Sequence, residues 1–189
     1  MSEIKVNTLR GLGVSNTGPA ISLNSTGTFS FDSGTLFIDS TNNRVGINLT
    51  NPAYTIDVNG SINIAGQTRI STVNENIEYR SSGQSGNQDY NFDTAGIFYH
   101  PSVNGDITAR FTNVPTEQNR AYGFCIIFNQ GGSARRVNTT IQINGTNYTT
   151  RWLGGQSPTI TANRPEVFNF SIVNNNGSWL VLGQLSSFN

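Results

Sequence analysis

The stretch RVGINLTNPAYTIDVNGSINI, residues 44–64, contains four short apolar segments separated by Asn, Gly and Pro. Asn51-Pro52 biases Asn51 away from the helical region, and Asn59-Gly60 supplies the positive φ that a tight hairpin requires. Strands of four or five residues joined so closely cannot make a core within one chain. They can if three chains wrap around one axis and each contributes Val, Ile and Leu to a shared interior. The stretch therefore predicts an intertwined β-stalk.

The same texture continues on both sides of this stretch. Between residues 29 and 75 the apolar segments are FSF, TLFID, RVGI, YTIDV and SINI, and the breaks between them are DSG, STNN, NLTNPA and NG. Helical periodicity is absent almost everywhere, because Gly, Asn or β-branched residues interrupt each window with apolar residues at i, i+3, i+4 and i+7. We therefore expect an all-β chain in which residues 29–75 form a short-stranded, trimeric stalk.

Residues 1–28 hold too little apolar surface to fold alone. One alternating run, IKVNTL, is followed by a Gly/Asn/Pro segment and then by a second apolar segment, AISL. We interpret residues 1–28 as an arm that needs a partner surface, with Ile4, Val6 and Leu9 as its anchoring residues.

Residues 76–189 are predicted to form an independent domain. Seven candidate strands are separated by turn signals such as VNG, NG and NNNG: GIFYH, DITARF, YGFCIIFN, RVNTTIQI, TNYTTRWL, VFNFSIV and SWLVLGQL. This spacing is typical of an antiparallel β-sandwich of the jelly-roll type. Alternation in VFNFSIV places Asn169 and Ser171 on one face and Phe168 and Phe170 on the other. The run FCIIF, residues 124–128, is apolar on both faces, so it is either a central strand or a strand whose second face a neighbouring subunit covers.

Charge and hydropathy exclude several kinds of partner. Charged residues make up 12% of the chain, and the 11 basic and 11 acidic side chains cancel. No long-range field is then available to hold phosphates or anionic lipid. No apolar run approaches the ~18 residues of a membrane span, and the opening MSEIKVNTLRGLG is too polar for a secretory signal. We expect no nucleic-acid partner, no membrane insertion and synthesis in a cytosol.

Carboxylate pairs are the first place to look for catalysis. Glycan-cleaving spikes need two carboxylates ~5 to ~9.5 Å apart. Asp89 with Asp93 and Asp32 with Asp39 are the candidate pairs. We favour turn-capping, solvent-facing roles for Asp89 and Asp93, because Asp in loops usually hydrogen-bonds its own backbone.

Metal and nucleophile chemistry has little support. The single histidine, His100, is followed by Pro101 and is expected to be a partly exposed residue at the rim of a strand. The single cysteine, Cys125, cannot form an intrachain disulfide and is expected to be an inert apolar residue. We predict no cofactor, no metal site and no enzymatic activity.

Ligand binding competes with a purely structural role. Trp152, Tyr148 and Tyr122, together with Arg135 and Arg136, could form a surface for sugars. An aromatic face stacks on the apolar side of a pyranose, while polar side chains satisfy its hydroxyls. Two alternatives stay open: Trp152 could be an edge of the core, and the arginine pair could be an exposed loop tip or an intersubunit contact.

Several segments resemble phage structural proteins. The opening SEIKVNTLRGLGVSNTGPAISL is similar to the openings of cyanobacterial phage structural proteins. NRVGINLTNPAYTIDVNGSINI resembles the VGIGTTNP-Y-LDVNGS element of phage tail-fibre proteins, with Asn48 and Leu49 where fibres often have Gly and Thr. NQGGSARRV, INGTNYTTRWLGGQSPTITANRPEVFNFSIV and the final WLVLGQLSSF resemble a C-terminal module of phage virion proteins.

The resemblance implies a virion structural protein that is assembled in the host cytoplasm: a homotrimeric tail or neck fibre or appendage involved in host attachment. By that resemblance, residues 1–28 dock on other virion proteins, residues 29–75 form the trimeric stalk, and residues 76–189 form an outward-facing head. The aromatic and polar residues named above make host-surface glycan a candidate partner of this head. Two alternatives stay open, a capsid decoration protein and a small glycan-degrading tail spike.

Overall fold

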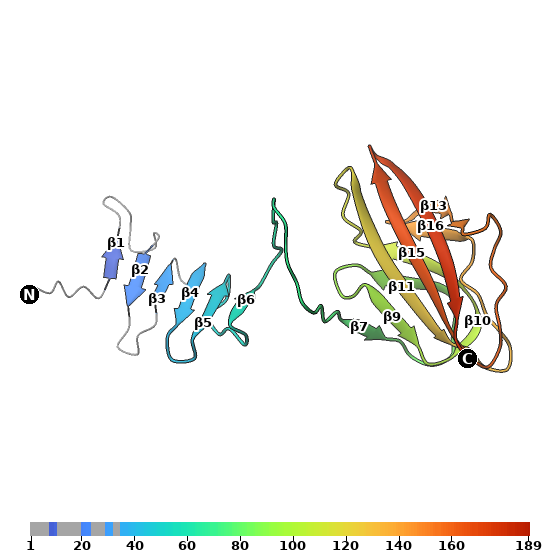
Figure 1. Cartoon of the computed structure of the whole chain (residues 1–189), viewed down its shortest axis with the longest axis horizontal. Coiled ribbons are helices and arrows are strands. Elements are labelled where there is room, and N and C mark those ends of the chain that lie inside the picture. Colours follow the sequence, from blue (N-terminus) through green and yellow to red (C-terminus); the bar gives the residue numbers. More distant parts are fainter. Residues whose placement is uncertain (1–7, 11–19, 24–28, 32–34) are drawn as a thin grey trace, which may run out of the picture. The chain divides into compact units, whose positions relative to one another are not determined.

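The structure is a computed structural model that describes the backbone of residues 8–10, 20–23, 29–31 and 35–189, with side chains from residue 35 onward. All the regular secondary structure in these residues is β-strand, which confirms the all-β fold class (Figure 1). The chain divides into two compact units, residues 1–70 and 71–189, close to the predicted boundary between residues 75 and 76. Within the described part of the chain, no helix is long and apolar enough to cross a membrane.

The N-terminal unit contains one sheet whose six short strands lie side by side in chain order. They are β1 (Thr8–Arg10), β2 (Ala20–Leu23), β3 (Phe29–Phe31), β4 (Leu36–Asp39), β5 (Arg44–Ile47) and β6 (Ile56–Val58). Strands β1 to β5 pair antiparallel, and β6 runs parallel to β5. The segment expected as a separate arm therefore contributes β1 and β2 to the same sheet as β3 to β6. Ile4 and Val6 lie outside the described residues, and Leu9 is paired with Ile21 between β1 and β2.

Local hydrogen bonds explain the turn between β4 and β5. Oδ1 of Asp39 accepts from the backbone N–H groups of Thr41 at 3.0 Å and Asn42 at 3.2 Å, and Oδ2 accepts from Nδ2 of Asn42 at 2.8 Å. The bond from the Asn42 side chain is the largest influence on the Asp39 carboxyl, whose pKa lies below its usual value. Asn43 then adopts a left-handed φ of 55°, which Asn tolerates better than most residues.

The prediction of a hairpin at Asn59-Gly60 is wrong, because no strand follows Gly60 until Ile77. Asn59 instead exchanges two side-chain bonds with Asn48 across the β5–β6 pair, with Nδ2 of Asn48 3.1 Å from the Asn59 carbonyl and Nδ2 of Asn59 3.3 Å from the Asn48 carbonyl. Residues 59–76 then form no strand, so SINI is not a strand of this sheet. A hairpin signal yields a strand only where the second segment finds a face to bury. Among the described residues Ile62 and Ile64 find no such face, and they remain 68% and 53% exposed.

The C-terminal unit, called the head below, is a β-sandwich of two sheets. Its strands are β7 (Ile77–Tyr79), β8 (Gln84–Asn91), β9 (Ile97–His100), β10 (Val103–Thr112), β11 (Arg120–Asn129), β12 (Thr140–Ile143), β13 (Thr146–Thr149), β14 (Arg151–Trp152), β15 (Pro165–Asn175) and β16 (Ser178–Ser187). The four-stranded sheet has the order β13-β12-β10-β8, and the six-stranded sheet has the order β14-β16-β15-β11-β9-β7. Figure 1 shows β9, β11, β15 and β16 side by side.

Strand directions in the head differ from the predicted antiparallel pattern, because both sheets are mixed. β8, β10 and β12 run parallel to one another, as do β7, β9 and β11, and β14 is parallel to β16. The cause is the path of the chain, which alternates between the two sheets from β7 to β12. A strand that returns to its own sheet after one excursion to the other points in its original direction. Only β12–β13, β11–β15 and β15–β16 are antiparallel pairs.

Two predicted Asn-Gly hairpins are confirmed in the head. Asn144 and Gly145 join β12 to β13 with φ values of 47° and 86°, and Asn176 and Gly177 join β15 to β16 with φ values of 52° and 87°. Two consecutive positive φ angles define the type I′ turn, whose twist matches that of the flanking strands. The Asn144 side chain also bonds the backbone of Val114, accepting from its N–H at 3.1 Å and donating to its carbonyl at 2.8 Å.

An aromatic core fills the space between the two sheets of the head. The rings of Phe111 and Phe124 lie 4.3 Å apart, and those of Phe111 and Phe170 lie 5.6 Å apart. Further fully buried members are Tyr90, Phe98, Phe128, Phe168, Ile107, Ile126, Ile141, Ile143 and Ile172. Every buried hydrophobic residue of the described chain lies in this head. Within residues 35–70 only Gly46 and Pro52 are buried, so these residues form no core among themselves.

Candidate functional site

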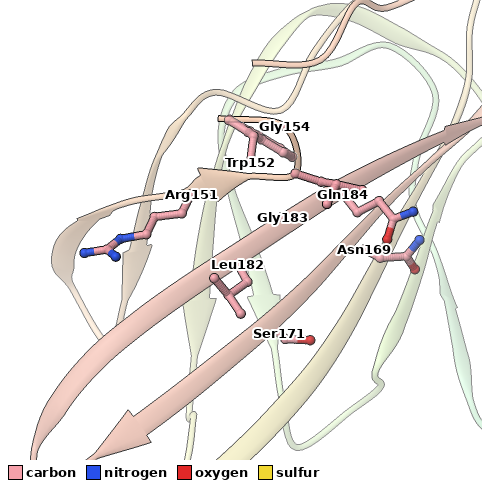
Figure 2. A pocket seen from close by; sticks show the side chains of 9 residues that line it. Arg151, Trp152, Gly154, Asn169, Ser171, Leu182, Gly183 and Gln184 are labelled. Carbon is pink, nitrogen blue, oxygen red and sulfur yellow. The ribbon is translucent and has the colours of Figure 1, made fainter. Parts of the chain in front are cut away.

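The head carries an open pocket of about 400 Å³ where β14, β15 and β16 meet. Its lining consists of Arg151, Trp152, Leu153, Gly154, Asn169, Ser171, Leu182, Gly183 and Gln184. Figure 2 shows Arg151 on one side and the amides of Asn169 and Gln184 on the other, with Leu182 and Ser171 between them. Most of these side chains are exposed, because they lie on the face of the six-stranded sheet that turns away from the core.

Close packing of Trp152 on Gly183 fixes the base of this pocket. β14 pairs with β16 so that Trp152 lies opposite Gly183, and a Cβ at Gly183 would come within 2.7 Å of the indole ring. Only glycine admits the ring at this position. The indole N–H donates to Oγ1 of Thr139 at 3.2 Å, and the ring lies 5.7 Å from that of Phe170. The structure thus places Trp152 at the edge of the core, 7% exposed.

The chemistry of the pocket suits an uncharged or anionic polyhydroxyl ligand. Arg151 offers guanidinium donors, the Asn169 and Gln184 amides each donate and accept, and the Ser171 hydroxyl does both. Leu153 and Leu182 expose 73% and 42% of their surface and supply an apolar contact. A pocket with a few convergent polar groups around an apolar floor is the usual form of a small-ligand site.

Sequence reasoning missed Arg151, Asn169, Ser171 and Gln184 as site residues. A signal was present for two of them, because the alternation in VFNFSIV already placed Asn169 and Ser171 on one face of a strand. The pairing of Asn169 with Gln184 across β15 and β16 depends on strand register, which the sequence does not state.

The five predicted glycan-contact residues do not gather at this pocket. Of the five, only Trp152 lines it. Tyr148 is half-buried on β13, where it pairs with Ile141 and packs against the core. The other three residues lie in two further places.

Tyr122 belongs to a separate aromatic group on β11. Its ring lies 5.4 Å from that of Phe92 and 6.1 Å from that of Trp179, and its hydroxyl donates to Oε2 of Glu117 at 3.3 Å. Loss of solvent, and then the Glu117 charge, raise the pKa of the Tyr122 phenol. Tyr122 lines a shallow hollow of about 400 Å³ with Phe92 and Gly96.

Arg135 and Arg136 follow β11 in a loop that hydrogen bonds hold to neighbouring residues. The Gln130 side chain accepts from the Arg135 N–H at 2.9 Å and donates to Oε2 of Glu166 at 2.8 Å. The Arg136 N–H donates to Oδ1 of Asp106 at 3.1 Å. The Arg136 side chain is 46% exposed, which fits the loop-tip alternative for this residue.

The expectation that His100 is an exposed rim residue is wrong. His100 is 0% exposed, because the alternation of β9 turns it inward on the same side as Phe98. Its Nε2 lies 2.9 Å from the Tyr90 hydroxyl, and its Nδ1 has no hydrogen-bond partner among the described residues. Loss of solvent lowers the pKa of His100 to about 4, with a smaller contribution from the Arg80 charge.

Of the four carboxylates considered for catalysis, those of Asp89 and Asp39 make structural contacts. Oδ1 of Asp89 lies 2.7 Å from Nε of Arg110 on the neighbouring strand, and the Asp93 N–H donates to the Asn91 side chain at 3.0 Å. Asp39 holds the turn described above, and Asp32 lies outside the described residues. Among the residues with described placement, no cluster of three His, Cys, Asp or Glu could hold a metal ion.

Comparison with known proteins gives no relative from which to transfer a role. No family model matches the chain, no curated protein is similar to it, and no solved structure matches it.

Proposed function

We propose that the protein is a self-associating structural protein of a phage virion, a homotrimeric fibre or appendage in which the N-terminal unit forms the stalk and the head attaches to the host surface. The proposal combines the resemblance of the sequence with one structural observation, the lack of a core among residues 35–70. Its partners would be two further copies of the chain and other virion proteins.

Exposed apolar side chains carry the argument for self-association. Ile56, Ile62, Ile64, Ile70 and Val73 expose between 53% and 68% of their surface. Fully burying such a side chain is worth ~1.5–3 kcal/mol, so each contributes on the order of 1–2 kcal/mol when an assembly covers it. Because the apolar residues recur between turns in a nearly uncharged segment, identical chains can bury them around one axis without repulsion.

The head supports attachment through the pocket at β14, β15 and β16. Arg151, Asn169, Ser171 and Gln184 provide donors and acceptors for sugar hydroxyls, and Leu182 provides an apolar contact. An open site of this kind binds weakly on its own. Three such sites on one trimer would bind far more tightly to a repetitive glycan surface through effective concentration.

Sedimentation equilibrium of the full chain tests the assembly. We expect a trimer that persists on dilution, and we expect the double variant Ile56→Asn/Ile62→Asn to dissociate at a concentration at least ~10-fold higher. Ser61→Asn is the matched control, because it places the same side chain at an exposed position between the two. A wild-type chain that is monomeric at every concentration would contradict the trimeric stalk.

Cell binding with two arginine variants tests the attachment site. Arg151→Ala should weaken binding of the trimer to host envelope glycan, and Arg136→Ala should leave it unchanged, since Arg136 lies outside the pocket. The reverse result would favour the loop residues predicted from sequence. Release of reducing ends would favour a glycan-degrading spike, and absence of any host binding with intact virion incorporation would favour a decoration protein.

A further inference from the structure

The outer faces of the two sheets of the head differ in chemistry. Outward positions on the four-stranded sheet form a polar row, Asp89–Arg110–Gln142–Asn147, flanked by Asn87, Thr108, Asn91 and Thr112. A sheet face that meets water is expected to look like this. The outer face of β7, β9 and β11 in the six-stranded sheet lacks this polar character.

Two rows of apolar side chains cross that part of the six-stranded sheet. One row consists of Ile77, Ile97 and Cys125, which lie opposite one another on β7, β9 and β11. The second row consists of Tyr79, Tyr99, Ile127 and Val167, and it extends onto β15. The rings of Tyr79 and Tyr99 are 5.1 Å apart. We call these seven residues the apolar sheet face.

Exposure shows that the described chain leaves the apolar sheet face partly uncovered. Ile77 and Tyr79 are 58% and 70% exposed, and the other members are half-buried against one another. Large exposed apolar groups that are contiguous, rather than scattered, indicate an interaction surface. The apolar run FCIIF thus lies in a central strand, β11, and the described chain covers the outward face of that strand only in part.

We propose that a second copy of this chain covers the apolar sheet face, so that neighbouring heads contact each other within the trimer. This inference rests on the proposed trimer and adds a contact that the stalk does not require. None of the seven side chains of the face is charged, and the charge that acts on its centre is the Glu75 carboxylate, which after loss of solvent raises the pKa of the Cys125 thiol.

The size of the face also favours a tethered copy over an independent partner. Seven residues are about a third of the ~20–30 residues that a stable interface uses on each side. A free partner would bind such a patch weakly. A copy that the stalk already holds nearby needs little added affinity, because its effective concentration is in the millimolar range.

Cys125 provides a probe at the centre of the face. It is the only cysteine of the chain, it is half-buried, and it lies between Ile97 and Asn169 across the strands. We would measure its rate of alkylation by iodoacetamide in the full-length trimer and in the dissociated Ile56→Asn/Ile62→Asn chain. The expected result is at least ~10-fold slower alkylation in the trimer.

A face variant separates the head contact from the stalk. Ile127→Asn should leave the trimer assembled through the stalk but restore fast alkylation of Cys125. Thr140→Asn, at an outward position of the four-stranded sheet, should leave the slow rate unchanged. An unfolded head would show as a loss of tryptophan emission, since both tryptophans lie in the head.

The outcomes distinguish the two proposals. A wild-type trimer in which Cys125 reacts as fast as in the dissociated chain would overturn the head contact and leave the trimeric stalk standing. Protection of Cys125 only after host envelope or other virion proteins are added would also overturn it and assign the face to that partner. A chain that never forms a trimer would refute the proposed function, and the head contact with it.

Discussion

His100 makes the stability of the head sensitive to acid. The imidazole is 0% exposed and lies among Tyr90 and Phe128, with one ring nitrogen near the Tyr90 hydroxyl and the other unpartnered. Protonation would place a cation where one N–H has no acceptor, close to the guanidinium of Arg80. The pKa of His100 is therefore lowered from 6.5 to about 4 in the folded head.

The sign and size of the effect follow from proton linkage. From about one pH unit above 6.5 both folded and unfolded His100 are neutral, so there this residue adds no pH dependence. As the pH falls from 6.5 towards 4, the unfolded chain binds a proton that the folded head does not, and folding stability is lost. At ~1.36 kcal/mol per pH unit the loss is about 2 kcal/mol by pH 5 and about 3 kcal/mol at pH 4.

The assay is urea denaturation followed by tryptophan emission, which reports the head because both tryptophans lie there. His100→Gln is the comparison, since an amide can bond the Tyr90 hydroxyl but does not titrate. The free energy of unfolding of the wild type should fall by about 2 kcal/mol more than that of the variant between pH 7.5 and pH 5. Shifts from groups that do not interact with His100 are shared by both proteins and cancel. Parallel pH profiles would refute the assignment of a buried, neutral histidine.

Three further changes test the packing and turns of the head. Phe111→Ala should lower the free energy of unfolding by ~3–5 kcal/mol, because the ring is fully buried; a cost below ~1 kcal/mol in urea denaturation would contradict the core. Gly183→Ala should displace the Trp152 ring, shift its emission and cost ~1–3 kcal/mol, whereas Gly123→Ala, with open space around it, should leave the emission unchanged. Asn144→Ala should cost ~1–2 kcal/mol and lower the melting temperature, through loss of a favourable turn residue and two backbone bonds; an unchanged melting temperature would argue against that role.

Much of the fold could be predicted because the chain is punctuated by turn residues. The strands around Phe37, Val45, Phe98 and Phe168 were all anticipated from short apolar runs between Gly, Asn and Pro. Strand β8 was missed because QSGNQDYN is polar, and only Tyr90 in it is fully buried. Its place in the sheet comes from pairing with β10, which local sequence does not encode.

Strand direction and the site were less accessible to sequence reasoning. Alternation shows which side chains share a face, but it is identical for parallel and antiparallel neighbours, so the mixed sheets could not be anticipated. The same limit applies to the pocket. Trp152 was a candidate because of its residue type, but its role depends on Gly183, which lies far along the chain and faces the ring only through the β14–β16 register.

The failed hairpin at Asn59-Gly60 shows the difference between a turn signal and a strand. The signal describes backbone freedom at two residues, and it says nothing about cover for Ile62 and Ile64. Where the chain itself supplies a covering sheet, as after Asn144 and Asn176, the same dipeptide does produce a hairpin.

The alternation of the head chain between two sheets sets the order in which it can fold. β8 gains its neighbour only after β9 has crossed to the other sheet, and β9 gains β11 only after β10 has returned. The four-stranded sheet has all its strands once β13 is reached, whereas β11 of the six-stranded sheet must wait for β15, which lies far along the chain. In such non-local pairing, the entropy of closing each loop is lost before the strand contacts that offset it can form. The head should therefore fold late and as a single cooperative unit, with its slowly exchanging amides in both sheets protected to the same degree.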